Sequence, residues 1–460
     1  MDQSTSESLR FPPVAGMTVR AEFDGGAMSS DVGPLILRGI DQQIGLIDRL
    51  VQAVDDRRHP SYVAHSLHDL FTQRIFQIAC GYADGNDANA LRTDPLFKLG
   101  VNRHPLVQAM DLASAPTFSR LENAVSTRDL YRLARAFVDQ FIASYPQPPA
   151  VIVLDLDHSE DPTHGQQELS FYNHYYRHHC YLPLFLFEGL SGKFITAALR
   201  PGQRPTGAEN AMIVTRVVKR LRAVWPRTRI VLRGDAHFAN PELMQLAVDD
   251  PAIDFIFGLA GNQALSPLAE PFLAAHRGRL ETARRAGLPL PAPTRTYHQI
   301  AYRAASWPQA FRVILKAEVM ALGDNPRFVV TTLDLPTPEC LYRDLYSARG
   351  QDENFIKMLK NDLASDRTSD QRFLANHLRL FFSCAAYVLH QALRSEILVH
   401  TELAKAQPLT VILKLFKLAV RVVAYKDRIK LHLPTGCPVK NLLRRVADLL
   451  FLARPPPLPA

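Results

Sequence analysis

The sequence lacks a long hydrophobic run. No segment contains about 18 uninterrupted apolar residues, the length that a membrane-spanning helix needs. The start, MDQSTSESLRFPPVAG, has neither a basic cluster nor an apolar stretch, so it does not predict a secretion signal. We therefore expect a protein without a membrane partner that is located in the cytoplasm.

Cysteine is scarce and scattered. The five cysteines form no C-x-x-C pair, which argues against a disulfide framework and against a structural zinc ribbon. They are Cys80, Cys180, Cys340, Cys384 and Cys437. The 460 residues are 47% hydrophobic, which is enough for two or three domains with sizeable cores.

Acidic residues are nearly absent from the C-terminal part of the chain. Residues 414–454 hold ten basic residues against Asp427 and Asp448, a net +8 that equals the formal charge of the whole chain. The basic residues are Lys414, Lys417, Arg421, Lys426, Arg428, Lys430, Lys440, Arg444, Arg445 and Arg454. Concentrated positive charge favours a polyanionic partner, most often nucleic acid, although a solubilising tail has the same composition.

The N-terminal part predicts a helical domain. A strand-like segment, MTVRAEFD, ends in a Gly-Gly turn. After it, LILRGIDQQIGLIDRLVQAV and VAHSLHDLFTQRIFQIACGY carry apolar residues at spacings of three and four, with a break at HPSY. A proline-rich linker, SYPQPPA, follows. We assign residues 1–148 to a helical domain that contacts DNA or dimerises.

The hydrophobic period changes after this linker. VIVLDLD at 151–157 alternates as a strand, and YLPLFLFEG and KFITAALRPG predict a hairpin. Thr206 and Glu209 fit a capping box at the start of the helix TGAENAMIVTRVVKRLRAVW. RIVLRGD predicts a strand, NPELMQLAVDD a helix and IDFIFGLAG a further strand. This α/β succession matches an RNase H-like core, a mixed sheet flanked by helices.

The rest of the chain divides into three parts. Residues 149–261 form the first part of the predicted core, and residues 262–343 predict a β-rich insertion without helices that contains FRVILKAEVMAL and RFVVTTLDL. Residues 344–400 return to helices and complete the core, and residues 401–460 form a basic C-terminal segment.

The stretch YSARGQDENFIKMLKND at 346–362 has an unusual polar pattern. On a regular helix Tyr346, Arg349, Glu353 and Lys360 fall within an arc of about 60°, beside an apolar arc that anchors the helix. A salt-bridged helix surface is the simplest interpretation of this segment alone.

Two further acids follow strands of the predicted core. Asp157 ends the first strand and Asp235 follows the fourth, and an RNase H-like sheet places these two strands side by side. Glu353, on a helix packed there, would join them. Three converging carboxylates repel one another unless cations neutralise them, and oxygen ligands suit Mg²⁺ or Mn²⁺. Two such ions can activate the attacking oxygen and stabilise the leaving oxygen of a phosphodiester.

Asp155 competes with Asp157 because both residues point to the same face of the strand. We favour Asp157 for its position at the strand end and for the hydroxyl of Ser159, two residues later. The five histidines of HSEDPTHGQQELSFYNHYYRHHC raise the alternative of a zinc site, but their spacing fits no familiar ligand pattern. The aromatic and basic residues of the same stretch fit either DNA contact or core packing.

The helix at 346–362 resembles DDE insertion-sequence transposases, whose signature Y-x2-R-x3-E-x6-K matches Tyr346, Arg349, Glu353 and Lys360. LDLDHSEDPTHGQQELSFYNHYY, YLPLFLFEG, ALRPG and LRGDAHFANPEL resemble the insertion sequence 1380 family in particular. GLIDRL, QRIFQIACGYADGNDANALRTDP and PTFSRLEN resemble it too, so the likeness covers nearly the whole chain. The family's usual first motif has Thr where Ser159 stands.

The resemblance implies a transposase that binds the terminal inverted repeats of its own element, cleaves the ends and joins them to target DNA. Asp157, Asp235 and Glu353 would be its catalytic residues and would hold two Mg²⁺ ions, for which Mn²⁺ can substitute. Tyr346, Arg349 and Lys360 would contact DNA near the cleaved end. The resemblance also implies a dimer or a larger synaptic complex, associated with the nucleoid. A domesticated DNA-binding protein without catalysis and a stand-alone RNase H-like nuclease are the alternatives.

Overall fold

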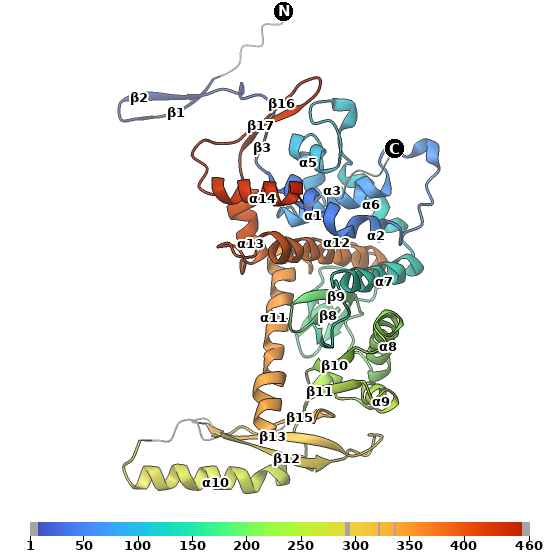
Figure 1. Ribbon diagram of the computed structural model, residues 1–460, viewed down its shortest axis with the longest axis vertical. Coiled ribbons are helices and arrows are strands. Elements are labelled where there is room, and N and C mark those ends of the chain that lie inside the picture. The colour runs from blue at the N-terminus through green and yellow to red at the C-terminus, as the bar shows by residue number, and fades with distance from the viewer. Residues whose placement is uncertain (1–7, 290–294, 321–322, 335–336, 453–460) are drawn as a thin grey trace, which may run out of the picture. The chain divides into compact units, whose positions relative to one another are not determined.

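The computed structural model describes residues 8–289, 295–320, 323–334 and 337–452; Arg454 and the first seven residues of the chain lie outside them. The chain forms two compact units (Figure 1). Unit 1 comprises Met1–Ala124, Asp362–Ala364 and Ala385–Ala460, and unit 2 comprises Val125–Asn361 and Ser365–Cys384. The division thus falls at Val125 rather than after residue 148, and the N-terminal and C-terminal parts share one unit.

Unit 2 is built on a mixed nine-stranded sheet. The strand order is β12-β13-β15-β11-β10-β4-β8-β9, with β14 paired to β13. Strand β10 is parallel to both of its neighbours, β4 on one side and β11 on the other, and the other strand pairs described in this sheet are antiparallel. The strands are β4 (Val151–His158), β8 (Leu184–Glu188), β9 (Lys193–Ala198), β10 (Arg229–Gly234), β11 (Ile253–Leu259), β12 (Arg295–Tyr302), β13 (Phe311–Met320), β14 (Gly323–Asp324) and β15 (Arg327–Thr331). The predicted mixed sheet flanked by helices is confirmed.

Helices cover both faces of this sheet. Ile152, Leu154 and Leu156 of β4 enter the larger core, to which the helices α7, α8, α9 and α10 contribute. Val153 enters a second core on the other face, against Leu341. Figure 1 shows α8 and α9 on one side of β10 and β11, and α11 on the other. The helices are α7 (Thr127–Ala143), α8 (Gly207–Val224), α9 (Pro241–Asp249), α10 (Leu265–Arg285) and α11 (Gly350–Lys357), and η3 (Ala236–Phe238) follows β10.

Several local predictions in unit 2 are confirmed. Thr206 and Glu209 form the expected capping box at the start of α8. The runs FRVILKAEVMAL and RFVVTTLDL contain β13 and β15, although residues 321–322 and 335 lie outside the described residues.

The expectation that residues 262–343 lack helices is wrong, because the 21-residue helix α10 lies there. Its buried residues keep a helical spacing; they are Leu265, Ala269, Leu273 and His276. Pro271 lies inside the helix, and because proline usually ends a helix, the sequence pattern did not predict one here. Strands β12, β13 and β15 extend the main sheet rather than forming a separate one.

The histidine-rich stretch of unit 2 forms a small three-stranded sheet in the order β5-β7-β6. The strands are β5 (Asp161–Pro162), β6 (Phe171–Asn173) and β7 (His178–Tyr181). His158 stacks on Phe238, and His178 faces Glu160 at 3.1 Å. In the described parts of the chain these histidines do not gather into a group of three or more residues that could hold a metal.

Unit 1 combines short helices with two small sheets. One is the hairpin β1 (Leu9–Val14) and β2 (Met17–Ala21), and the other has the order β17-β16-β3. Its remaining elements are β3 (Met28–Ser29), α1 (Gly33–Ile44), α2 (Leu46–Val51), η1 (Pro60–Tyr62), α3 (Leu67–Ala79), α4 (Asp87–Leu91), α5 (Pro95–Gly100), η2 (Gln108–Met110), α6 (Ala115–Ala124), η7 (Leu393–Ile397), α13 (Pro408–Val411), η8 (Ile412–Phe416), β16 (Val420–Ala424), β17 (Ile429–His432) and α14 (Lys440–Leu452). The helix α12 (Phe373–Ala392) contributes residues to both units.

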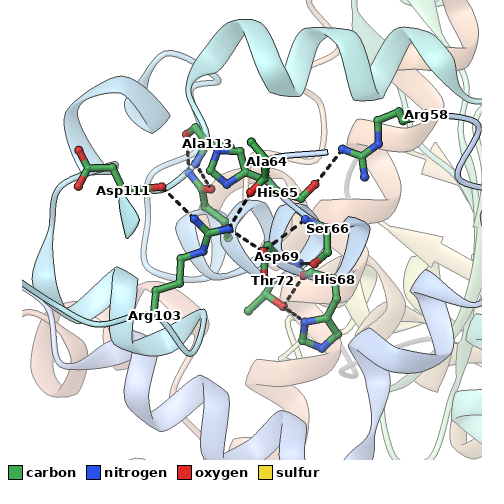
Figure 2. Close-up of polar contacts among 11 residues, drawn as sticks. Arg58, Ala64, His65, Ser66, His68, Asp69, Thr72, Arg103, Asp111 and Ala113 are labelled. Atoms are coloured by element: carbon green, nitrogen blue, oxygen red, sulfur yellow. Dashed lines mark hydrogen bonds and ion pairs between the residues drawn. The ribbon is translucent and has the colours of Figure 1, made fainter. Parts of the chain in front are cut away.

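The start of α3 shows how unit 1 fixes its short helices (Figure 2). Ser66 and Asp69 form a capping box, which satisfies free amide groups at the helix start. Arg103 donates to the Asp69 carboxylate at 2.7 Å and to the carbonyl oxygen of Asp111 at 3.1 Å. One arginine thus joins the helix start to the loop that precedes α6.

Over the described residues, no helix combines the length and the apolar content needed to cross a membrane.

Candidate active site

The first two predicted acids lie at one edge of the sheet in unit 2. Strands β4 and β10 are parallel, and their register pairs Leu156 with Gly234. Asp157, the penultimate residue of β4, and Asp235, the first residue after β10, therefore lie side by side. The structure brings these two residues together from positions 78 apart in the sequence, as the difference between their numbers shows.

Asp157 is the most perturbed of the predicted catalytic acids. Its side chain is 15% exposed, and the Arg349 guanidinium lies 3.5 Å from its carboxylate. Burial raises the pKa of Asp157 to about 7, Arg349 opposes this rise, and the nearby charges of Asp235 and Glu353 add to it. The three predicted acids therefore interact electrostatically in the folded protein.

Glu353 lies on α11 and faces the same arginine. The distance from the Arg349 guanidinium to the Glu353 carboxylate is 3.6 Å, and the Glu353 side chain is 53% exposed. Arg349 thus lies between two of the carboxylates, from a position four residues before Glu353. In this arrangement the arginine supplies positive charge that opposes carboxylate repulsion.

Asp235 has a partner of its own. Its carboxylate accepts a hydrogen bond from the backbone amide of His237 at 2.8 Å and lies 3.2 Å from the imidazole of the same residue. Burial acts to raise the pKa of Asp235, but the hydrogen bonds and charge of His237 outweigh it, so the pKa lies below its usual value. Sequence reasoning missed His237. The sequence feature that could have indicated His237 is its position two residues after Asp235, an acid that caps the turn following β10.

The remaining residues of the signature lie on the same helical segment. Burial raises the pKa of Tyr346, whose hydroxyl lies so close to Gly258 that a Cβ there would be 2.5 Å away. Lys360 donates to the backbone carbonyl of Glu160 and lies 3.4 Å from the Ser159 hydroxyl. Lys360 therefore contacts the loop after β4, the strand that carries Asp157.

The helix that carries these residues is not regular. It passes through a π-helical segment (η4, Cys340–Tyr346), a 3-10 turn (η5, Ser347–Arg349), α11 and a second π-helical segment (η6, Met358–Asp362). The predicted single stripe assumed about 100° per residue throughout, which the π-helical and 3-10 turns do not keep. Arg349 and Glu353 still meet, because they are one turn apart.

Asp155, the alternative to Asp157, has a different environment. Its two oxygens accept hydrogen bonds from Arg233 at 2.5 and 2.6 Å, and both side chains are fully buried. Arg233 also donates to the carbonyl oxygen of Leu345 at 2.7 Å, which lies on the signature helix, the helical segment Cys340–Asp362 that carries the signature residues. Sequence reasoning missed Arg233. Its signal was a charged residue inside the apolar strand RIVLRGD, directly opposite Asp155 in the parallel register.

Asp352 is a further residue that sequence reasoning missed. It precedes Glu353 and is fully buried, and its two oxygens have no hydrogen-bond partner among the described residues. Burial raises its pKa well above the usual value, and the charges of Asp155 and Asp157 add to this. Burial and the two neighbouring carboxylates thus both favour the protonated form of Asp352, the residue directly before Glu353.

The fit of the acids to a metal ion has two sides. Two aspartates and a glutamate are the oxygen ligands that Mg²⁺ and Mn²⁺ prefer. Across the described ranges, however, no group of three or more Asp, Glu, His or Cys residues stands close enough together to hold a metal. Arg349 lies between Asp157 and Glu353 instead. The donor chemistry therefore fits a divalent cation, while the side chains are arranged around an arginine.

Comparison with known proteins identifies the class. The family model described as "Transposase DDE domain group 1" matches residues 11–455. The chain belongs to this family, and it is therefore a DDE transposase, an enzyme that binds DNA and cleaves and transfers it. Enzymes of this class generally use divalent metal ions.

The chain was also compared with solved structures and with curated proteins. A cryo-EM structure of the piggyBac transposase synaptic complex with hairpin DNA is similar to this chain at 12% identity and a TM-score of 0.44, over 93% of this chain and 86% of that one. No curated protein matches the chain.

Proposed function

We propose that the protein is the transposase of a bacterial insertion sequence resembling the insertion sequence 1380 family. It binds the terminal inverted repeats of its element, hydrolyses the strands at the ends, and joins the free 3′-OH to target DNA. The observation that carries the proposal is the parallel register of β4 and β10, which sets Asp157 beside Asp235, with Arg349 linking Asp157 to Glu353. The strand order around β4 supports an RNase H-like core.

In this proposal Asp157, Asp235 and Glu353 are the catalytic residues and hold two Mg²⁺ ions, which Mn²⁺ can replace. When bound, the ions polarise the phosphodiester and stabilise charge on the attacking and leaving oxygens. Asp155 is not available as a ligand while both of its oxygens are hydrogen bonded to Arg233. We therefore assign the first acidic position to Asp157.

The cationic residues of the site have a positioning role in the proposal. Tyr346, Arg349 and Lys360 contact DNA phosphates or bases near the cleaved end, and the arginine and the lysine supply positive charge. Arg349 is 19% exposed, so its guanidinium can reach a phosphate placed at the carboxylates. Transposition needs two ends held together, so we propose a homodimer or larger assembly, acting in the cytoplasm on nucleoid DNA.

Cleavage of labelled DNA tests this proposal. The purified protein is incubated with a duplex carrying the terminal inverted repeats that flank its gene, with Mg²⁺, Mn²⁺ or EDTA, and products are mapped at nucleotide resolution. We expect metal-dependent nicks at the element boundary. Glu353→Gln should lower the cleavage rate about 100-fold or more, equivalent to about 2.7 kcal/mol, without loss of DNA binding.

A matched variant controls for the loss of one charge on the same helical segment. Glu339→Gln removes a carboxylate that is 50% exposed, close to the 53% of Glu353, and that pairs with Arg343 instead of Arg349. It should cut like the wild type. Binding to the repeats without cleavage under any metal would favour the domesticated binder, and cleavage without strand-transfer products would favour a nuclease.

A further inference from the structure

The sheet β17-β16-β3 of unit 1 presents a basic face that the proposed catalytic chemistry does not use. Val420 and Val422 of β16 are buried, so the alternate residues of the strand face outward. The register pairs Arg421 with His432 and Val423 with Lys430 on that outward face. We call residues 420–432 the basic ribbon.

Charge is concentrated on this ribbon. Its 13 residues contain four basic side chains and one acid, Asp427, a net charge of +3. The basic residues are Arg421, Lys426, Arg428 and Lys430, and all four are exposed. Among the residues that the structure describes, Arg421, Lys426 and Lys430 form no ion pair, whereas Arg428 lies 3.8 Å from Asp427. Three cations are therefore free to meet a polyanion.

The tip of the ribbon is ordered by its own contacts. The backbone amide of Tyr425 donates to the carbonyl oxygen of Arg428 at 2.8 Å, which closes the turn. The Arg428 guanidinium lies 4.7 Å from the centre of the Tyr425 ring, a cation–π contact. Tyr425 remains 46% exposed. An aromatic ring and a guanidinium are thus presented together at the tip.

The dimensions of the ribbon suit duplex DNA. Two paired strands lie about 4.8 Å apart, and a two-stranded ribbon with its side chains fits the major groove, which is about 12 Å wide. The rival occupant is a second copy of the chain that adds a strand to the edge strand β17. Lys430 lies in the middle of β17, and a lysine on an edge strand opposes strand addition.

We propose that the basic ribbon is a duplex-DNA binding surface, with Arg421, Lys426 and Lys430 on phosphates and the Tyr425–Arg428 tip in the major groove. This inference rests on the proposed function, because it assumes a DNA substrate. It adds a contact on unit 1, whereas the proposed catalytic residues belong to unit 2. It also assigns a specific role to a portion of the basic C-terminal segment.

Salt-dependent binding tests the ribbon. The full-length protein is titrated into a fluorescently labelled duplex carrying the terminal repeat, in EDTA to prevent cleavage, at several KCl concentrations. Lys426→Gln/Lys430→Gln should weaken binding about tenfold at physiological salt. It should also lower the magnitude of the slope of log K against log salt by about 2, one unit for each phosphate that the variant no longer neutralises.

A charge-matched variant in the same unit provides the control. Arg92→Gln/Lys405→Gln removes two exposed cations elsewhere in unit 1 and should leave the slope unchanged. Circular dichroism and thermal melting establish that both variants are folded. An equal loss in both variants would mean that only net charge matters and would overturn the ribbon proposal, as would wild-type binding by the ribbon variant.

Two other outcomes are separable. If the ribbon variant changes from dimer to monomer in analytical ultracentrifugation and its binding loss follows that change, the ribbon is a contact between copies, and the DNA proposal fails. If the wild type binds no duplex at any salt concentration, the transposase function itself fails. If the ribbon variant binds the duplex as tightly as the wild type does, only the ribbon proposal fails, and the proposed function stands.

Discussion

Asp155 and Asp157 lie two residues apart on the same face of β4, yet their surroundings are opposite. Asp155 is fully buried and closed off by two hydrogen bonds from Arg233. Asp157 lies near the strand end, 15% exposed, with the longer 3.5 Å contact to Arg349 and two other carboxylates nearby. One aspartate has its acceptor oxygens satisfied inside the protein, and the other retains acceptor capacity.

The comparison teaches how one strand can serve structure and chemistry together. The Asp155–Arg233 pair joins β4 to β10 and, through the Leu345 carbonyl, to the signature helix. This rigid contact fixes the elements from which Asp157, Asp235 and Glu353 project. A site that must hold several carboxylates close together needs such support, because their mutual repulsion opposes it.

Removing Arg233, the partner of the buried Asp155, should have the largest effect on stability. In Arg233→Met, Asp155 is left buried without a counter-charge, and we expect the free energy of unfolding to fall by about 3–5 kcal/mol. Denaturant unfolding followed by circular dichroism measures the change. The double variant Asp155→Leu/Arg233→Met should recover most of the stability, because it removes both buried charges. A single variant as stable as the wild type would contradict the structural role of the pair.

Asp161, four residues after Asp157, extends the comparison to an acid without a partner. It is fully buried, and neither carboxylate oxygen has a hydrogen-bond partner among the described residues. Burial raises its pKa well above the usual value of 3.8, and the charge of Lys360 only partly opposes this. The folded state therefore holds its proton to higher pH than the unfolded state does, so stability from this group is full below pH 3.8 and declines as pH rises.

Asp161→Asn should abolish that decline. At about pH 4 the variant should have the same melting temperature as the wild type, because a neutral amide replaces a neutral acid. At about pH 8 it should melt about 5 °C higher, since it does not incur the cost of keeping a buried acid protonated. Melting temperatures across this range provide the measurement. Asp366→Asn, which changes a nearby, half-buried acid, is the matched control and should show a smaller change with pH. A constant difference between Asp161→Asn and the wild type across this range would show that Asp161 ionises freely.

The sequence predicts the local features of this site well. The alternation of VIVLDLD predicts Asp157 at the end of a strand, and β4 ends one residue later, at His158. The capping pattern of Thr206 and Glu209 marks the start of α8. These features depend on residues within a few positions of one another. The assignment of Asp157, Asp235 and Glu353 to catalysis remains a prediction that the cleavage experiment tests.

Other features depend on contacts between distant segments. Arg233 is recognisable as a structural residue only when the register of β10 against β4 is known, because that register sets it opposite Asp155. The pairing of β16 with β3 joins Arg421 to Met28, so one unit contains both ends of the chain, which no local pattern indicates. Helix α10 escapes sequence interpretation because Pro271 outweighs its apolar spacing.

The smallest of the expected effects on stability concerns Arg349, the cation beside Asp157. Arg349→Gln removes the positive charge between Asp157 and Glu353, so repulsion among the carboxylates increases. In EDTA at about pH 8 we expect the free energy of unfolding to fall by about 1 kcal/mol, well below the effect of Arg233→Met. Arg343→Gln is the control, because that arginine is 60% exposed and pairs with Glu339 outside the site. Its effect should stay within about 0.5 kcal/mol.

Divalent cations then separate an electrostatic role of Arg349 from simple packing. A cation bound by the carboxylates supplies the charge that the variant lacks, and it stabilises the folded state by mass action. Mg²⁺ should therefore raise the melting temperature of Arg349→Gln more than that of the wild type, in which the guanidinium already opposes the repulsion. If Mg²⁺ shifts both proteins equally, Arg349 does not compete with metal for these carboxylates. The difference between Asp155 and Asp157 would then reflect burial alone, without a distinct role for their two arginine partners.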